Sequence, residues 1–351
     1  MMKRIKPMFA GLLLWCMFGL LLTFGFLQSA AIRQFHSVSL RYNTPISGQT
    51  AYRARQYSIT NIENNPFWPT FWHECRMSFS VGARTAHANT VSFSGDASLV
   101  WPARYITGSA PSSIDSTGIA VSNALAHSLW GSTDIIGMTV YVNDKPRIVR
   151  GVFEGTADIA LLSFHIEDTA QSWTAVELAG GQPNPTRSQA ENFATASGLS
   201  RPDYILMGGS IALSRLMSIF PLLIIAAYGL ILLAGFTKKH YGAAATLIIF
   251  AGFILFAIFL PNMLEALPPW IIPTHWSDFS FWSNLLLQAN DSLREFLRVN
   301  PMLRDVELKI HLLRQIGIFI ASVCSGIIVC AQWHCHIRQN DYGNMNISTT
   351  R

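Results

Sequence analysis

The sequence predicts an α+β extracytoplasmic domain on a four-helix transmembrane α bundle, with one span before the domain and three after it. Three observations support this fold class: four long apolar blocks, a long stretch without such a block, and basic residues on one side of the predicted membrane. Charged residues make up only 13% of the chain, against about 25% in soluble domains. This composition argues against a disordered chain, a coiled coil or an ordinary cytosolic enzyme.

Crossing a bilayer takes about 20 apolar residues in a helix. Four blocks meet this length, at residues 8–27, 216–236, 241–261 and 316–333. The predicted domains are an anchor helix (1–30), the extracytoplasmic domain (31–208), helices 2 and 3 (209–261), a partly helical extracytoplasmic loop (262–311), and helix 4 with a cytoplasmic tail (312–351). A signal peptide cleaved near Ser29 is the alternative for the first block, which is longer than the usual signal core of about 7 to 15 residues.

The distribution of basic residues predicts the orientation, because Lys and Arg in short flanking segments stay cytoplasmic. With the N-terminus inside, the inner segments carry a single acid, Asp341. Their basic residues are Lys3, Arg4, Lys6, Lys238, Lys239, Arg338 and Arg351. We therefore expect a multi-pass protein of the plasma (inner) membrane with both termini cytoplasmic, and the basic net charge calls for no nucleic-acid partner.

The most regular pattern in the domain lies at residues 95–156. A short apolar run ends at Ser122, which can cap a helix over 123–130 that Gly131 would end. Two β-branched runs, 139–142 and 147–153, flank a polar turn and predict a hairpin. Earlier, 61–72 is expected to be an aromatic-rich loop, whereas the alternation around Phe79 and Phe93 predicts half-buried strands.

These motifs resemble a known family. Gly95-Asp96-Ala97, Tyr105-Ile106-Thr107-Gly108, Ile119-Ala120-Val121-Ser122, Leu125-Ala126, Leu129-Trp130-Gly131-Ser132, Asp134-Ile135-Ile136-Gly137, Val140-Tyr141-Val142 and Val149-Arg150-Gly151-Val152-Phe153 are similar to landmarks of the MacB-like periplasmic core domain. That domain belongs to permease subunits of bacterial MacB/FtsX-class ABC transporters. The resemblance implies an ABC ATPase subunit and a second permease subunit, or self-association, as partners. It also implies the order of one span, a large outer domain and three further spans.

One feature departs from that family. The resemblance implies a cytoplasmic coupling helix between spans 2 and 3, but only the four polar residues 237–240 separate the two blocks. Four residues are too few for a separate helix of two turns. Lys238 and Lys239 remain the candidate partner contact, although a Lys pair at a membrane edge also serves simply as a topology anchor.

The sequence holds no pattern that predicts catalysis or a cofactor. A Gly-x-x-x-x-Gly-Lys-Ser/Thr run is absent, so any ATPase is a separate chain. His73-Glu74-Cys75 has metal-ligand residue types, but neighbours in an extended chain point to opposite faces. Cys330 and His334 share a helix face, next to Cys335 and His336, yet two ligands alone predict no metal site.

No acidic residue lies inside a predicted span, and Arg215 and Arg314 lie at the outer ends of spans 2 and 4. This pattern argues against an ion-coupled carrier. Pro221 is expected to kink span 2. The outer loop is rich in Pro and Trp at 264–276 and amphipathic at 278–313, which predicts an interfacial helical pair.

The sequence therefore predicts a non-enzymatic, permease-like subunit of an ABC-type export or mechanotransmission complex, embedded in the lipid bilayer and without a cofactor. The alternative is a membrane-anchored extracytoplasmic receptor or scaffold without transport activity. The short inner connection at 237–240 is what keeps this alternative open.

Overall fold

The computed structural model describes residues 2–61, 63, 67–180, 186–240, 250–251, 254 and 279–348. The chain divides into two compact units. The membrane unit comprises Met1–Arg33, Ser210–Thr274 and Lys309–Arg351, and the sheet unit comprises Gln34–Gly209 and His275–Leu308. Each unit is therefore assembled from segments that are far apart in the sequence.

Three long helices supply the described part of the membrane unit: α1 (Met2–Ile32), α6 (Gly209–His240) and α9 (Leu303–Ser348). Within the described residues, three helices are long and apolar enough to cross a membrane, with candidate spans at Leu13–Phe35, Gly209–Ile231 and Leu303–Gln332. These correspond to three of the four predicted blocks. The predicted third span, 241–261, lies outside the described residues apart from three helical positions (250, 251 and 254).

One predicted connection is wrong. Residues 237–240 were expected to form a loop, but they are the last turn of α6. The segment at 278–313, expected to be a helical pair, contains the amphipathic helix α8 (Phe279–Arg298) and the start of α9 at Leu303.

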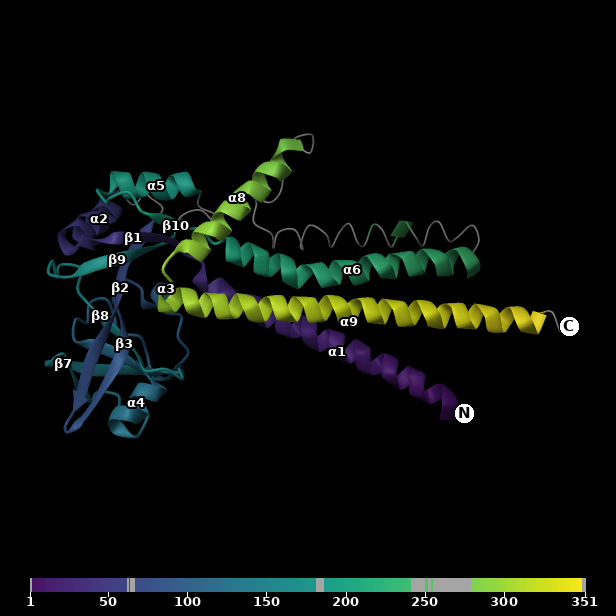
Figure 1. Cartoon of the computed structure of the whole chain (residues 1–351), viewed down its shortest axis with the longest axis horizontal. Helices are drawn as coiled ribbons and strands as arrows, with labels where there is room; N and C mark the ends of the chain where they lie inside the picture. Colours follow the sequence, from purple (N-terminus) through teal and green to yellow (C-terminus); the bar gives the residue numbers. More distant parts are fainter. Residues whose placement is uncertain are drawn as a thin grey trace. The chain divides into compact units, whose positions relative to one another are not determined.

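A ten-stranded mixed sheet forms the centre of the sheet unit, with the order β10-β1-β9-β2-β3-β8-β5-β7-β4 and β6 paired with β2 and β7. Strands β1, β9 and β2 lie side by side in it (Figure 1). The pairs β3–β8 and β5–β7 are parallel, and the other pairs are antiparallel. The strands are β1 (Val38–Ser47), β2 (Trp68–Val81), β3 (Arg84–Ser94), β4 (Tyr105–Gly108), β5 (Gly118–Ser122), β6 (Thr139–Val142), β7 (Lys145–Phe153), β8 (Ile159–Ser163), β9 (Ser172–Ala179) and β10 (Tyr204–Leu206).

Both faces of this sheet are covered. Three helices, α2 (Gly48–Thr60), α4 (Asn123–Trp130) and α5 (Arg187–Ala196), contribute to the larger apolar cluster, which includes Phe71. The short helix α3 (Ala97–Val100) contributes to a second cluster around Trp72, on which Met302 and Leu303 also pack. Because adjacent residues of a strand point to opposite faces, Phe71 and Trp72 fall into different clusters.

The helix and hairpin predicted at 123–153 are confirmed. Ser122 caps α4 through the backbone N–H of Leu125, and Gly131 ends it at φ 75°. Strands β6 and β7 pair around Asn143 and Asp144, whose φ angles of 45° and 65° match the two positive values of a type I′ turn.

The prediction of a loop over 61–72 is wrong for its second half. Strand β2 begins at Trp68 and pairs with β9 from its first residue. Proline at position 69 hid this strand, since proline is rare inside sheets.

Candidate functional site

The edge of the sheet formed by β10, β1 and β9 is where the chain enters and leaves the membrane helices. Strand β1 follows α1 after the short 3-10 helix Arg33–Phe35, and β10 precedes α6 by two residues. Residues of β10 pair with β1, Ser39 lying opposite Leu206. Helix α9 then places its first residues, through Leu308, in the same sheet unit. This edge therefore connects directly to three long helices.

Glu177 of β9 is the centre of a buried charge cluster at this edge. Its side chain is fully buried and accepts hydrogen bonds from the hydroxyls of Ser37 and Ser39, each at 2.6 Å. The indole N–H of Trp72 donates to the same carboxylate at 3.0 Å. Three donors, from the residue before β1, from β1 and from β2, thus satisfy a charge that is otherwise costly to bury.

Two arginines approach this carboxylate from different elements. The guanidinium of Arg41, on β1, lies 3.7 Å from Glu177 and that of Arg304, on α9, lies 3.5 Å from it. Arg304 also donates to the carbonyl of Leu99 at 2.9 Å and to the Ser37 hydroxyl at 2.8 Å. An arginine on α9 is therefore hydrogen-bonded to two other segments of the sheet unit.

Asp305 completes the connection between α9 and the sheet. One of its oxygens accepts from Arg41 at 2.8 Å, and the other accepts from the backbone N–H of Met302 at 3.2 Å. Arg41 lies over the ring of Trp72, 4.7 Å from its centre, which adds a cation–π contact. The Asp305 carboxylate thus binds Arg41 of β1. It also stabilises the start of α9, where the first backbone N–H groups need acceptors.

Glu74 of β2 is a third carboxylate at this helix start. Its Oε1 accepts from the backbone N–H of Leu303 at 2.6 Å. Burial raises the pKa of Glu74 to about 7, although the hydrogen bond from Leu303 and the charge of Arg41 oppose this shift. Acceptors from β2 and from α9 itself therefore share the N–H groups at the helix start.

The balance of charge explains the state of Glu177. Burial alone would raise the pKa of its carboxyl group. Arg304, Arg41 and the two serine hydroxyls outweigh burial, so the pKa of Glu177 lies below its ordinary value. The carboxylate stays ionised near neutral pH, and a buried ion pair with several hydrogen bonds resists the loss of either partner. The arrangement is suited to holding α9 on the sheet.

The partner contact predicted from sequence is not part of this site. Lys238 and Lys239 lie in the last turn of α6, so the candidate partner contact is helical. Glu74 does belong to the cluster, whereas the sulfur of Cys75 lies 3.7 Å from the imidazole of His73. Among the described residues, no three His, Cys, Asp or Glu side chains gather as they would around a metal ion.

Sequence reasoning missed the charge cluster because its members are distant along the chain. Arg41 and Asp305 are separated by 264 positions. The one available signal was an acid inside an apolar strand, since Glu177 follows Val176 and precedes Leu178. A charge in that position needs a buried partner, but the sequence alone does not identify it.

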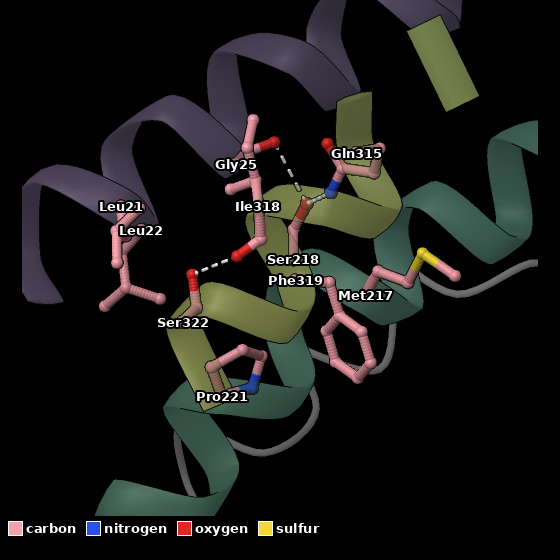
Figure 2. Close-up of a pocket in the computed structure, with 10 residues that line it drawn as sticks. All are labelled: Leu21, Leu22, Gly25, Met217, Ser218, Pro221, Gln315, Ile318, Phe319 and Ser322. Carbon is pink, nitrogen blue, oxygen red and sulfur yellow. Dashed lines mark hydrogen bonds between the residues drawn. The ribbon is translucent and has the colours of Figure 1, made fainter. Parts of the chain in front are cut away.

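The membrane unit has a polar contact of its own at a small pocket between α1, α6 and α9 (Figure 2). The Ser218 hydroxyl donates to the carbonyl of Gly25 at 3.2 Å, and the Gln315 amide donates to Ser218 at 3.0 Å. Pro221, the predicted kink position, lines the same pocket and lies inside α6. These hydrogen bonds connect the three helices.

The chain is only weakly similar to known proteins. No family model and no curated protein matches the chain. Among solved structures, the extracellular domain of the noncanonic ABC-type transporter YknZ from Gram-positive bacteria is 10% identical with a TM-score of 0.37, over 47% of this chain and 96% of that one. The periplasmic region of MacB from Actinobacillus actinomycetemcomitans is 12% identical with a TM-score of 0.40, over 50% and 89%.

A domain of a putative permease protein from Porphyromonas gingivalis is 14% identical with a TM-score of 0.34, over 48% of this chain and 86% of that one. Structural similarities this weak do not establish the family of this chain. What this chain does therefore has to follow from its own residues and topology.

Proposed function

We propose that this chain is a permease-like membrane subunit of an ABC-type export or mechanotransmission complex. In this proposal a separate ATPase chain hydrolyses ATP, and a second permease subunit or a second copy of this chain completes the complex. Movement of the membrane helices passes through the charge cluster to the extracytoplasmic sheet. The subunit itself catalyses no reaction.

The observation that carries the proposal is the attachment of α9 to the sheet by buried ion pairs. Arg304 and Asp305, in the first turn of this helix, contact Glu177 and Arg41. The helix then continues without a break to Ser348. A continuous helix with a fixed end transmits a displacement, whereas a flexible linker would absorb it.

The order of elements along the chain also supports the proposal. An apolar helix precedes the sheet unit, and further apolar helices follow it. The 351 residues contain no P-loop motif, and the proposal assigns ATP binding to a separate ATPase chain. Lys238 and Lys239, at the end of α6, are the proposed contact for an acidic surface of that ATPase.

A receptor or scaffold without transport activity is the second candidate. It is favoured by the short polar interval at 237–240, which continues α6 and leaves no separate coupling helix within that interval. In this case the sheet unit would bind a partner outside the membrane, and the charge cluster would serve stability alone.

Affinity purification of the tagged full chain from its native host, in mild detergent, separates the two candidates. The proposal predicts that an ABC ATPase co-purifies in stoichiometric amount. Changing both Lys238 and Lys239 to Glu should remove the ATPase by charge repulsion, while Lys145→Glu, on the hairpin of the sheet unit, should leave it bound. Recovery of the chain without an ATPase, under conditions that preserve a control ABC complex, would contradict the proposal and favour the receptor or scaffold.

A further inference from the structure

We propose that the pocket between α1, α6 and α9 binds one water molecule, which donates hydrogen bonds to the backbone carbonyl of Met217 and to the side-chain oxygen of Gln315. All three helices belong to the membrane unit, and the pocket lies within their candidate spans. The ligand is therefore a buried water inside the membrane bundle. This inference concerns the chain by itself and does not rest on the proposed function.

Pro221 removes one hydrogen-bond donor from α6. In an α-helix the N–H of each residue donates to the carbonyl four positions earlier, and proline has no N–H. The carbonyl that loses its helical donor is that of Met217, and Met217 and Pro221 line the same pocket. Ordered water is one of the groups that satisfy such a carbonyl in membrane helices.

Gln315 of α9 supplies the second acceptor. The residue is 1% exposed, and its amide oxygen is buried without a hydrogen-bond partner among the described residues. Its amide nitrogen is already used, because it donates to the Ser218 hydroxyl at 3.0 Å and to the carbonyl of Ser214 at 3.4 Å. A buried oxygen without a donor is costly, and lipid offers it no donor.

The hydroxyl groups at the pocket do not supply the missing donors. The single proton of the Ser218 hydroxyl serves either the carbonyl of Gly25, at 3.2 Å, or that of Ser214, at 3.0 Å (Figure 2). The Ser322 hydroxyl donates to the carbonyl of Ile318 at 2.8 Å. Among the residues described here the pocket therefore has more acceptors than donors, and a water molecule brings two donors.

The size and charge of the pocket identify the ligand as a small neutral molecule. Its free space accommodates about one water molecule. None of the residues that the structure describes around the pocket is acidic, so a bound cation would be buried without compensation. A water that satisfies both acceptors leaves α6 free to bend at Pro221, because it forms no rigid contact between the helices.

Radiolytic hydroxyl-radical labelling of the full chain in lipid nanodiscs tests this inference. X-rays produce the radicals from water, so side chains beside a bound water are oxidised, and methionine is readily oxidised. Met217, which lines the pocket, should be labelled. Met17 is the control within the chain, because it is exposed within the candidate span of α1 and lipid should surround it. Labelling of Met217 that does not exceed that of Met17 would overturn the proposal.

Two variants test the two acceptors. Pro221→Ala restores the N–H that donates to the Met217 carbonyl, and Gln315→Leu removes the amide oxygen. Each should lower the labelling of Met217 to the level of Met17. The matched control is Gln332→Leu, at an exposed position of the same helix, which should label as the wild type does. Labelling of Met217 that stays at the wild-type level in both test variants would contradict a water held by these acceptors.

A high-resolution crystal structure of the wild type gives a second measurement that does not depend on a variant folding normally. Density for one water should lie within about 3.2 Å of both the Met217 carbonyl oxygen and the Gln315 amide oxygen. A pocket filled by a lipid chain, or without density, would overturn the proposal. Neither result bears on whether an ATPase co-purifies, so this inference and the proposed function can fail separately.

Discussion

Replacing Glu177 by Gln is the most informative perturbation of the charge cluster. The change keeps the shape of the side chain and removes the carboxylate charge that lies within 4 Å of both Arg41 and Arg304. Among the described residues, Asp305 would then be the only carboxylate left in an ion pair with this cluster, and it contacts Arg41. Breaking a buried ion pair by removing one partner costs about 3 to 5 kcal/mol, because the remaining charge stays buried without compensation.

This free energy corresponds to a large shift in melting temperature. For a unit of roughly 200 residues, 1 kcal/mol lowers the midpoint by about 2 to 4 °C, so the expected loss is roughly 6 to 20 °C. Tryptophan fluorescence during heating of the chain in nanodiscs reports this transition, because Trp72 and Trp173 are buried in the sheet unit.

The exposed ion pair of Glu154 with Arg104 supplies the control. Glu154→Gln should change the midpoint very little, since exposed pairs contribute about 0 to 1 kcal/mol. If Glu177→Gln and Glu154→Gln melted within a degree or two of each other, the reasoning that the cluster fixes α9 to the sheet would be refuted.

Two further substitutions probe other contacts. Trp72→Phe removes the indole hydrogen bond to the buried carboxylate and weakens the cation–π contact with Arg41; we expect a loss of about 2 kcal/mol in the same melting assay. Gln315→Leu removes the hydrogen bond to Ser218 between α9 and α6 and should cost about 1 kcal/mol, measured by unfolding in mixed detergent micelles against Ser283→Ala, a substitution on α8, as control.

Local elements of the fold could be predicted where the signal is local. Ser122 and Gly131 bound α4 because a hydroxyl cap and a left-handed glycine act within a few residues. Asn143 and Asp144 likewise define the hairpin through backbone angles that few residue types adopt. The lengths of the apolar blocks likewise predicted three of the helices. A helix that crosses a bilayer has to be one continuous apolar segment, so the signal is again local.

The coupling site could not be predicted because its residues meet only in the folded chain. Arg41 is one of several arginines near the start of the domain, and Arg304 and Asp305 lie in a segment expected to form a helical pair at the membrane surface. Their role depends on the pairing of β1 with β9, which places Ser39 opposite Glu177. No local pattern in the sequence records that long-range register.

The measurement that tests the account most directly is hydrogen exchange in the complex recovered with its ATPase, with and without a non-hydrolysable ATP analogue. If the cluster couples the helix to the sheet, nucleotide should change protection in the first turn of α9 and in β1 and β9 together. A response confined to the cytoplasmic ends of the helices, with the first turn of α9 and both strands unchanged, would contradict the account.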